Sequence, residues 1–100
     1  MIIQPVLQAD AATTSLFAAT SATSIAPFNP KRPSLTIQVD PGETAKLYVL
    51  KGTGTVSTTV YSMILNAGGY YEAPVADVAL PFSGIWSAAP SIGANVTIGR

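Results

Sequence analysis

Residues 34–40 read Ser-Leu-Thr-Ile-Gln-Val-Asp, and this stretch decides the fold class. Its large apolar side chains alternate strictly with polar ones. Successive side chains of a strand point to opposite faces, so this alternation predicts a half-buried β-strand. The Asp-Pro-Gly-Glu sequence at 40–43 predicts a type II turn, because Pro41 presets φ and Gly42 supplies a positive φ. We expect residues 45–51 to form the returning strand.

Short runs rich in Val, Ile, Thr and Tyr recur along the rest of the chain, separated by eight Gly and eight Pro. Such runs are typical of strands, and Gly and Pro mark the turns between them. Pro74 confines the strand that begins at Tyr70 to a sheet edge or a strand end. The remaining strands are predicted over residues 2–8 (broken at Pro5), 13–25, 55–65, 75–80, 84–89 and 94–98, with a hairpin connection at 66–69.

Seven or eight short strands with turns between them indicate an all-β fold. It would be a single antiparallel β-sandwich or small barrel of the jelly-roll or immunoglobulin-like kind. A length of 100 residues suits one domain. We interpret residues 1–33 as an extended N-terminal segment or arm that can contribute strands. Residues 34–100 then form the β-sandwich core.

Charge is scarce in this chain. Ten of the 100 residues are charged, five basic and five acidic, whereas an average domain carries charge at about 25% of its positions. The neutral balance argues against nucleic-acid and membrane partners. No stretch is long and apolar enough for a transmembrane helix, and the start of the chain has no basic signal-peptide region.

The residue types that most often perform catalysis are missing. The chain has no His and no Cys, which removes the commonest general base and the thiolate metal ligands. Asp40 and Glu43 could approach each other as a carboxylate pair or a calcium site, but we expect a solvated turn tip. The run 51–55, Lys-Gly-Thr-Gly-Thr, has the wrong order for a phosphate loop. We therefore predict no enzyme, no catalytic or metal residue and no cofactor.

Several residues are instead candidates for contact with other proteins. Lys31 and Arg32 lie between two prolines, so we expect a stiff exposed loop. Tyr70 and Tyr71 should place one ring on each face of a strand, one in the core and one exposed. The full candidate interface set is Ile2, Ile3, Val6, Leu7, Leu16, Phe17, Lys31, Arg32, Tyr71 and Trp86.

The C-terminal third carries a resemblance. It reads Gly-Gly-Tyr-Tyr-Glu-Ala-Pro at 68–74, Leu-Pro-Phe-Ser-Gly-Ile-Trp-Ser-Ala-Ala at 80–89 and Gly-Ala-Asn-Val-Thr-Ile at 93–98. This succession resembles small structural proteins of tailed bacteriophages, in which an aromatic-Glu-x-Pro segment leads to a Pro-aromatic-x-Gly turn and two last strands. The resemblance implies a virion component, commonly a β-sandwich that decorates or cements a capsid.

Together these observations predict a non-enzymatic virion structural protein, a capsid decoration or cement subunit assembled in the host cytoplasm. Its partners would be the major capsid protein or another virion protein, with many copies or a homo-oligomer in a symmetric assembly. The alternative is a carbohydrate- or receptor-binding β-sandwich module at a fibre or tail tip, using Tyr70, Tyr71 or Trp86.

Overall fold

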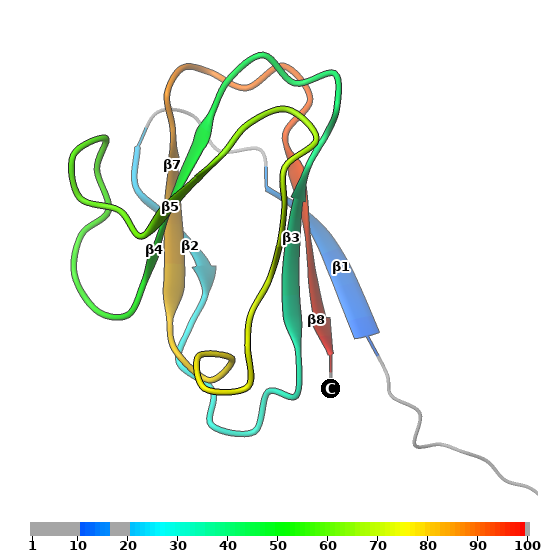
Figure 1. Cartoon of the computed structure of the whole chain (residues 1–100), viewed down its shortest axis with the longest axis vertical. Coiled ribbons are helices and arrows are strands. Elements are labelled where there is room, and N and C mark those ends of the chain that lie inside the picture. The colour runs from blue at the N-terminus through cyan, green and yellow to red at the C-terminus, as the bar shows by residue number, and fades with distance from the viewer. Residues whose placement is uncertain (1–10, 17–20, 100) are drawn as a thin grey trace, which may run out of the picture.

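A computed structural model describes residues 11–16 and 21–99 of the chain, the first range by its backbone only. The described residues form eight strands and no helix (Figure 1). The strands are β1 (Ala11–Leu16), β2 (Thr23–Ala26), β3 (Leu35–Val39), β4 (Leu47–Lys51), β5 (Met63–Leu65), β6 (Tyr70–Glu72), β7 (Phe82–Trp86) and β8 (Ala94–Gly99).

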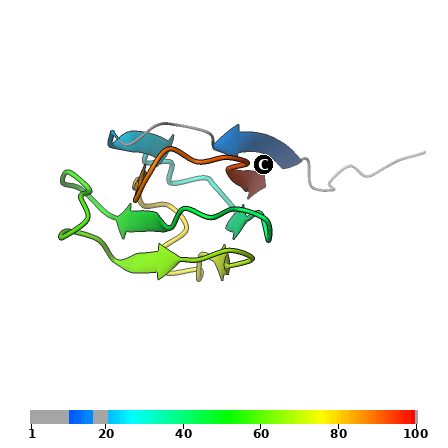
Figure 2. The same ribbon diagram turned by 90° about the horizontal axis from the view of Figure 1, so that it is seen from above.

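The strands form two four-stranded antiparallel sheets in the orders β1-β8-β3-β6 and β2-β7-β4-β5. Seen from above, the sheets lie as two layers (Figure 2). The pairing is nested along the chain, since β1 pairs with β8, β2 with β7, β3 with β6 and β4 with β5. Nested pairing across two sheets is the arrangement of a jelly roll. The all-β sandwich prediction is thus confirmed, and the strand order selects the jelly-roll form.

The core lies between the two sheets and comes from the alternation in the sequence. On β3, the side chains of Leu35, Ile37 and Val39 are fully buried. Trp86 and Phe82 of β7 are the two largest fully buried side chains. Fully burying one such large apolar side chain contributes about 1.5–3 kcal/mol, so these alternating positions stabilise the sandwich.

The predicted hairpin between residues 34–40 and 45–51 is wrong, although both strands exist. β3 and β4 belong to different sheets, and β4 pairs with β5 and β7. The 66–69 connection, also predicted as a hairpin, likewise joins strands of opposite sheets. Alternation shows which face of a strand is buried. It does not show which sheet the strand belongs to, because both sheets of a sandwich bury one face in the same core.

The turn at 40–43 forms without a positive φ at Gly42, so the type II prediction is wrong. The Asp40 side chain makes the turn instead, because its Oδ1 accepts a hydrogen bond of 2.8 Å from the Gly42 N–H. The Asp40 carbonyl also accepts one of 3.0 Å from Glu43. Because the Asp side chain accepts a hydrogen bond from the backbone N–H two residues further along, the turn does not need a positive φ at the glycine.

Two predicted strands are largely loop. Of residues 55–65, only Met63–Leu65 is strand, because Ser57 closes a turn with its backbone and its hydroxyl. The Ser57 N–H donates to the Val60 carbonyl at 2.9 Å, and Ser57 Oγ accepts from the Val60 N–H at 3.0 Å. Serine side chains compete in this way with the strand ladder. Residues 75–80 form consecutive turns after Pro74.

Three of the remaining strand predictions agree with the structure, but the single strand predicted over residues 13–25 is wrong, because β1 and β2 belong to different sheets. β6 is the edge strand expected at Tyr70, and β7 and β8 fall within a few residues of their predicted ranges. The N-terminal part supplies one edge strand to each sheet, β1 and β2. The strand predicted over residues 2–8 lies outside the described residues.

Candidate functional site

The outer face of the β2-β7-β4-β5 sheet is apolar over β4, β5 and Ile85 of β7, while Ser83 and Ser24 continue it toward β2. Tyr48 at the centre of β4 lies directly opposite Ile85 of β7 and Ile64 of β5, which gives a row across three strands. The Tyr61 ring packs edge-to-face on Tyr48 with ring centroids 5.1 Å apart. Leu50 follows on the same face of β4. We call Tyr48, Leu50, Tyr61, Ile64 and Ile85 the apolar face.

This surface is open to solvent. Ile64 is 38% exposed and Tyr61 is 41% exposed, while the other three members are half-buried. Among the side chains that the structure describes, charged ones lie only at its ends: Lys46 precedes β4, and Lys51 at the far end pairs with Asp77 at 2.7 Å. Contiguous apolar surface bordered by polar groups is typical of an interaction site.

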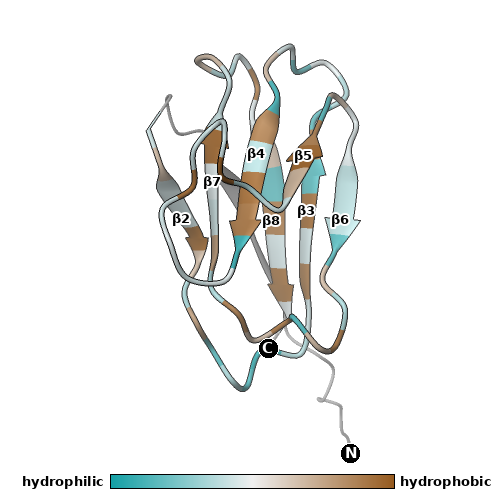
Figure 3. Ribbon diagram, turned by 60° about the vertical axis from the view of Figure 1, so that its left-hand side comes forward, coloured by the Kyte–Doolittle hydropathy of each residue, from teal (hydrophilic) through white to brown (hydrophobic). Residues whose placement is uncertain are grey.

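The outer face of the other sheet is polar by contrast. Its described outward positions on β3 are Thr36 and Gln38, which lie opposite Glu72 and Tyr70 of β6. Asn95 of β8 continues this polar surface on the other side of Gln38. Figure 3 colours β4 and β5 mostly hydrophobic and β6 mostly hydrophilic along their lengths, with inward and outward positions together. The two outer faces of the sandwich are therefore unequal.

None of the five residues of the apolar face is among the contact candidates expected from the sequence. The sequence feature that could have indicated this face is the run Leu-Tyr-Val-Leu at 47–50, which is apolar at every position. An uninterrupted apolar run predicts a strand that is covered on both faces. Ile85 beside Trp86 gives the same signal on β7.

Two of the aromatic residues predicted to make contacts belong to the core. Trp86 is 1% exposed, so its side chain is not part of the surface. Tyr71 points inward and packs on Phe82 with ring centroids 6.1 Å apart, and burial raises the pKa of its phenol. The strand does place one ring on each face, but the exposed ring is Tyr70, at 56%. The assignment of Tyr71 and Trp86 to a contact surface is therefore wrong.

Arg32 is a further correction, because its side chain is 4% exposed. Its Nη1 donates to the carbonyls of Val78 and Leu80 at 2.7 and 3.1 Å, and its Nη2 donates to the Pro27 carbonyl. These bonds join the β2–β3 loop to the β6–β7 loop, and burial lowers the pKa of the guanidinium. Lys31 is exposed, as expected.

The other candidates fall outside what the structure describes. Ile2, Ile3, Val6, Leu7 and Phe17 lie outside the described residues. Leu16 is placed by its backbone alone, opposite Ala94 of β8.

Glu43 was predicted on a solvated turn tip, but it is 3% exposed. Its carboxylate accepts backbone hydrogen bonds from two segments far apart in the sequence. The donors to Oε1 are Ile92 at 2.6 Å and Gly93 at 2.7 Å, and the donors to Oε2 are Ala45 at 2.9 Å, Thr44 at 3.0 Å and Ser91 at 3.1 Å. Burial acts to raise the pKa of Glu43, but the backbone hydrogen bonds outweigh it and lower the pKa to about 2. The carboxylate has a structural role, since it fixes the 43–45 and 91–93 loops to each other.

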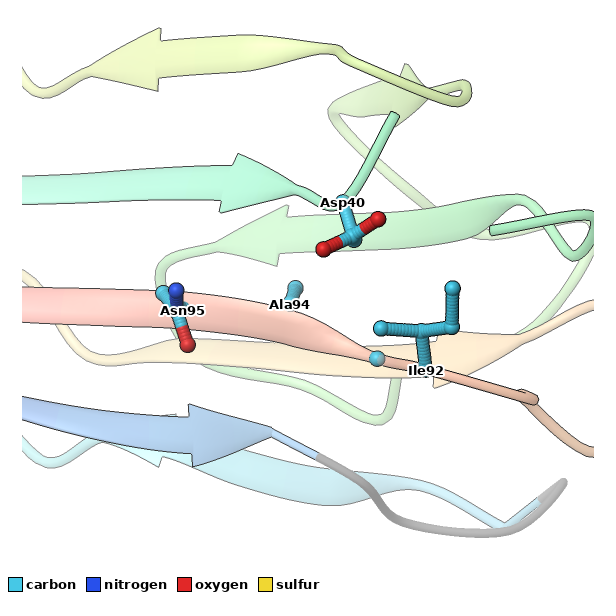
Figure 4. A pocket seen from close by; sticks show the side chains of 5 residues that line it. Asp40, Ile92, Ala94 and Asn95 are labelled. Atoms are coloured by element: carbon cyan, nitrogen blue, oxygen red, sulfur yellow. The ribbon is translucent and has the colours of Figure 1, made fainter. Parts of the chain in front are cut away.

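A shallow hollow lies beside this loop pair, between Asp40 and the start of β8 (Figure 4). Asp40, Ile92, Gly93, Ala94 and Asn95 line it, and its volume is about 30 Å³. Small-molecule pockets enclose roughly 300–1,000 Å³, so the hollow has room only for water-sized groups. The Asp40 Oδ1 is already engaged by the Gly42 N–H.

Within residues 11–16 and 21–99, no group of three or more His, Cys, Asp or Glu side chains gathers as metal ligands would. That part of the chain also contains no helix able to span a membrane. Comparison with known proteins found no matching family model, no matching curated protein and no matching solved structure.

Proposed function

We propose that this chain is a non-enzymatic structural subunit of a tailed-bacteriophage virion, a capsid decoration or cement protein. It acts by burying its apolar face against neighbouring proteins of the particle. The partner is the major capsid protein or another virion protein, and many copies repeat the contact in a symmetric assembly. Each copy then adds a modest binding free energy that multiplies over the particle.

The observation that carries the proposal is the apolar face on a chain with little charge. The described outward positions of β4, β5 and β7 have no charged side chain at their centre, and the whole chain has a net charge of zero. Soluble domains normally keep a net charge away from zero and avoid contiguous apolar patches. The jelly roll adds general support, because this architecture is used by viral capsid domains and by lectins.

The carbohydrate-binding alternative has less support. Of the three aromatic residues that suggested it, Trp86 and Tyr71 are in the core. Tyr70 alone remains exposed for stacking on a sugar.

Purified virus particles test the proposal directly. We expect the chain in fixed stoichiometry with the major capsid protein, as measured by quantitative mass spectrometry. Ile64→Lys should lower incorporation about tenfold or more, because burying a charge at this face costs more than the roughly 1.4 kcal/mol that corresponds to a factor of ten.

Gln38→Lys is the matched control, since it adds the same charge on the polar outer face, and it should be incorporated normally. Both variants should retain the wild-type melting temperature within a few degrees, because both positions are exposed. Particles without the chain, or equal incorporation of both variants, would refute the proposal.

A further inference from the structure

The exposed ring of Tyr70 does not stand alone on the polar outer face of the β1-β8-β3-β6 sheet. Tyr70 of β6 lies directly opposite Gln38 of β3, and Gln38 lies directly opposite Asn95 of β8. All three side chains are exposed. Neighbouring strands lie about 4.8 Å apart, so the three side chains form a row about 10 Å long across three strands. We call Tyr70, Gln38 and Asn95 the polar row.

The polar row offers an apolar ring together with hydrogen-bonding groups. Nε2 of Gln38 donates a hydrogen bond of 3.1 Å to the Gly68 carbonyl, which holds the side chain in place and leaves its Oε1 facing a ligand as an acceptor. The Asn95 amide supplies two donors and an acceptor, and the Tyr70 hydroxyl supplies one donor and an acceptor. A side chain that is already fixed loses less conformational entropy when a ligand binds.

The hollow described above lies at one end of the polar row. Asn95 lines it, and so does Asp40, which follows Gln38 by two positions, about 7 Å along the chain. In Figure 4, Asp40 lies on one side of the hollow, and Asn95 and Ile92 lie on the other. Its volume of about 30 Å³ holds a water-sized group such as one hydroxyl. The Asp40 carboxylate has the lone pairs to accept a hydrogen bond from that hydroxyl.

The charges around the polar row exclude an anionic ligand. Asp40 lies at one end of the row, and Glu72, next to Tyr71 on β6, is exposed on the same face as Tyr70. The basic side chains that the structure describes lie elsewhere, in the β2–β3 loop and at the two ends of β4. An anionic ligand would therefore be repelled by two carboxylates and attracted by no nearby cation.

The polar row also suits a sugar better than a protein. The buried core of a protein interface is mostly apolar, and this face offers a single ring as its apolar contact. A neutral sugar needs little more, because the C–H face of a pyranose stacks on one aromatic ring. Its hydroxyl groups both donate and accept hydrogen bonds, which matches the amides of Gln38 and Asn95 and the carboxylate of Asp40.

We propose that the polar row, with Asp40 at its end, is a binding site for a neutral oligosaccharide. One pyranose ring stacks on Tyr70, the next lies over Gln38 and Asn95, and one of its hydroxyl groups enters the hollow beside Asp40. The site is on the sheet opposite to the apolar face, so the inference does not rest on the proposed function. A subunit held by its apolar face still presents the polar row, and many copies raise the avidity of a weak single contact.

An array of immobilised oligosaccharides, probed with the full chain, tests this site. The array carries neutral glycans built from glucose, galactose, mannose and N-acetylglucosamine, together with sialylated and sulfated counterparts. We expect binding to at least one neutral glycan and weaker binding to the anionic counterparts of that glycan. Isothermal titration calorimetry with the neutral glycan that binds then gives the Kd of the wild type and of each variant.

The variants separate stacking on Tyr70 from a general effect on the fold. Tyr70→Ala should raise the Kd about tenfold, because it removes the ring, whereas Tyr70→Phe keeps the ring and should change the Kd less than about threefold. Asn95→Ala should raise the Kd severalfold. The matched control is Phe28→Ala, which removes another exposed ring, 62% exposed in the β2–β3 loop, and should leave the Kd unchanged.

Three results would each overturn the proposal: no binding to any neutral glycan, stronger binding to the anionic counterparts, or an equal Kd for Tyr70→Ala and Phe28→Ala. If the melting curve shows that Tyr70→Ala is unfolded, Asn95→Ala takes its place, and a wild-type Kd for this variant would overturn the proposal. Incorporation of Ile64→Lys into particles is measured separately, so failure of the glycan site and failure of the proposed function are distinguishable.

Discussion

A single carboxylate joins the loops at one end of the sandwich. Glu43 accepts backbone N–H groups from residues 44–45 and 91–93, and this environment lowers its pKa from 4.5 to about 2. A carboxyl group with a lower pKa in the folded than in the unfolded protein stabilises the folded state when it is ionised. This stabilisation is complete at pH values above the pKa of the unfolded protein. The contribution is therefore present above pH 4.5 and is lost as the pH falls toward 2.

Glu43→Gln should remove this pH dependence. Gln has one acceptor oxygen where Glu43 has two, and its NH₂ would face backbone N–H donors. We expect a lower Tm than wild type at pH 7, and a difference that shrinks as the pH falls from about 4.5 to about 2. Thermal melts followed by circular dichroism across this range measure it. Parallel curves for the two proteins would contradict the assigned role of the carboxylate.

Arg32 shows why such residues escape prediction. Between Pro30 and Pro33 the sequence describes a polar loop, and Lys31 behaves accordingly. The carbonyls that bind the Arg32 guanidinium include those of Val78 and Leu80, 46 and 48 residues away. No local pattern indicates that these carbonyls converge, and the same is true of the donors from 91–93 around Glu43.

At the scale of the element, the sequence predicts burial better than pairing. The alternation in β3 is confirmed residue by residue, because apolar burial on one face is what produces it. The assignment of β3 and β4 to opposite sheets depends on the whole sandwich, so the turn between them could not reveal it. The turns at 57–60 and after Pro74 interrupt runs whose residue types alone predict strands.

Two glycines test the turn geometry. A Cβ at Gly69 would lie 2.8 Å from the Asn66 carbonyl oxygen and 3.3 Å from the Leu65 Cα, both backbone atoms of one tight turn. We expect Gly69→Ala to destabilise the fold by about 1–3 kcal/mol, as overpacking does. This corresponds to a decrease in Tm of at least about 4 °C for a domain of this size.

Gly42→Ala is the matched control. Its Cβ would meet only the ends of two side chains, with Ile92 Cδ1 at 3.0 Å, and its φ is not positive. We expect a loss below about 1 kcal/mol, measured by urea unfolding at equilibrium. Equal losses for both variants would contradict the turn described for residues 40–43.

At the scale of the molecule, the unequal outer faces of the jelly roll account for the composition. The eight charged residues that the structure describes lie on β6, in the loops and at the end of β4, and leave the apolar face without charge at its centre. The composition predicts a surface that other proteins cover, and the apolar face is the surface that we propose for this role. The five residues of that surface become visible only when β4, β5 and β7 are placed side by side.

The central claim is that the apolar face is a contact surface between proteins, other copies of the chain included, and the mass of the purified chain in solution tests it most directly. Light scattering at several concentrations should give a mass that rises above 10.3 kDa with concentration for the wild type. Ile64→Lys should stay at the monomer mass, because it places a charge in the contact. A wild-type chain that remains a monodisperse monomer at every concentration would contradict the account.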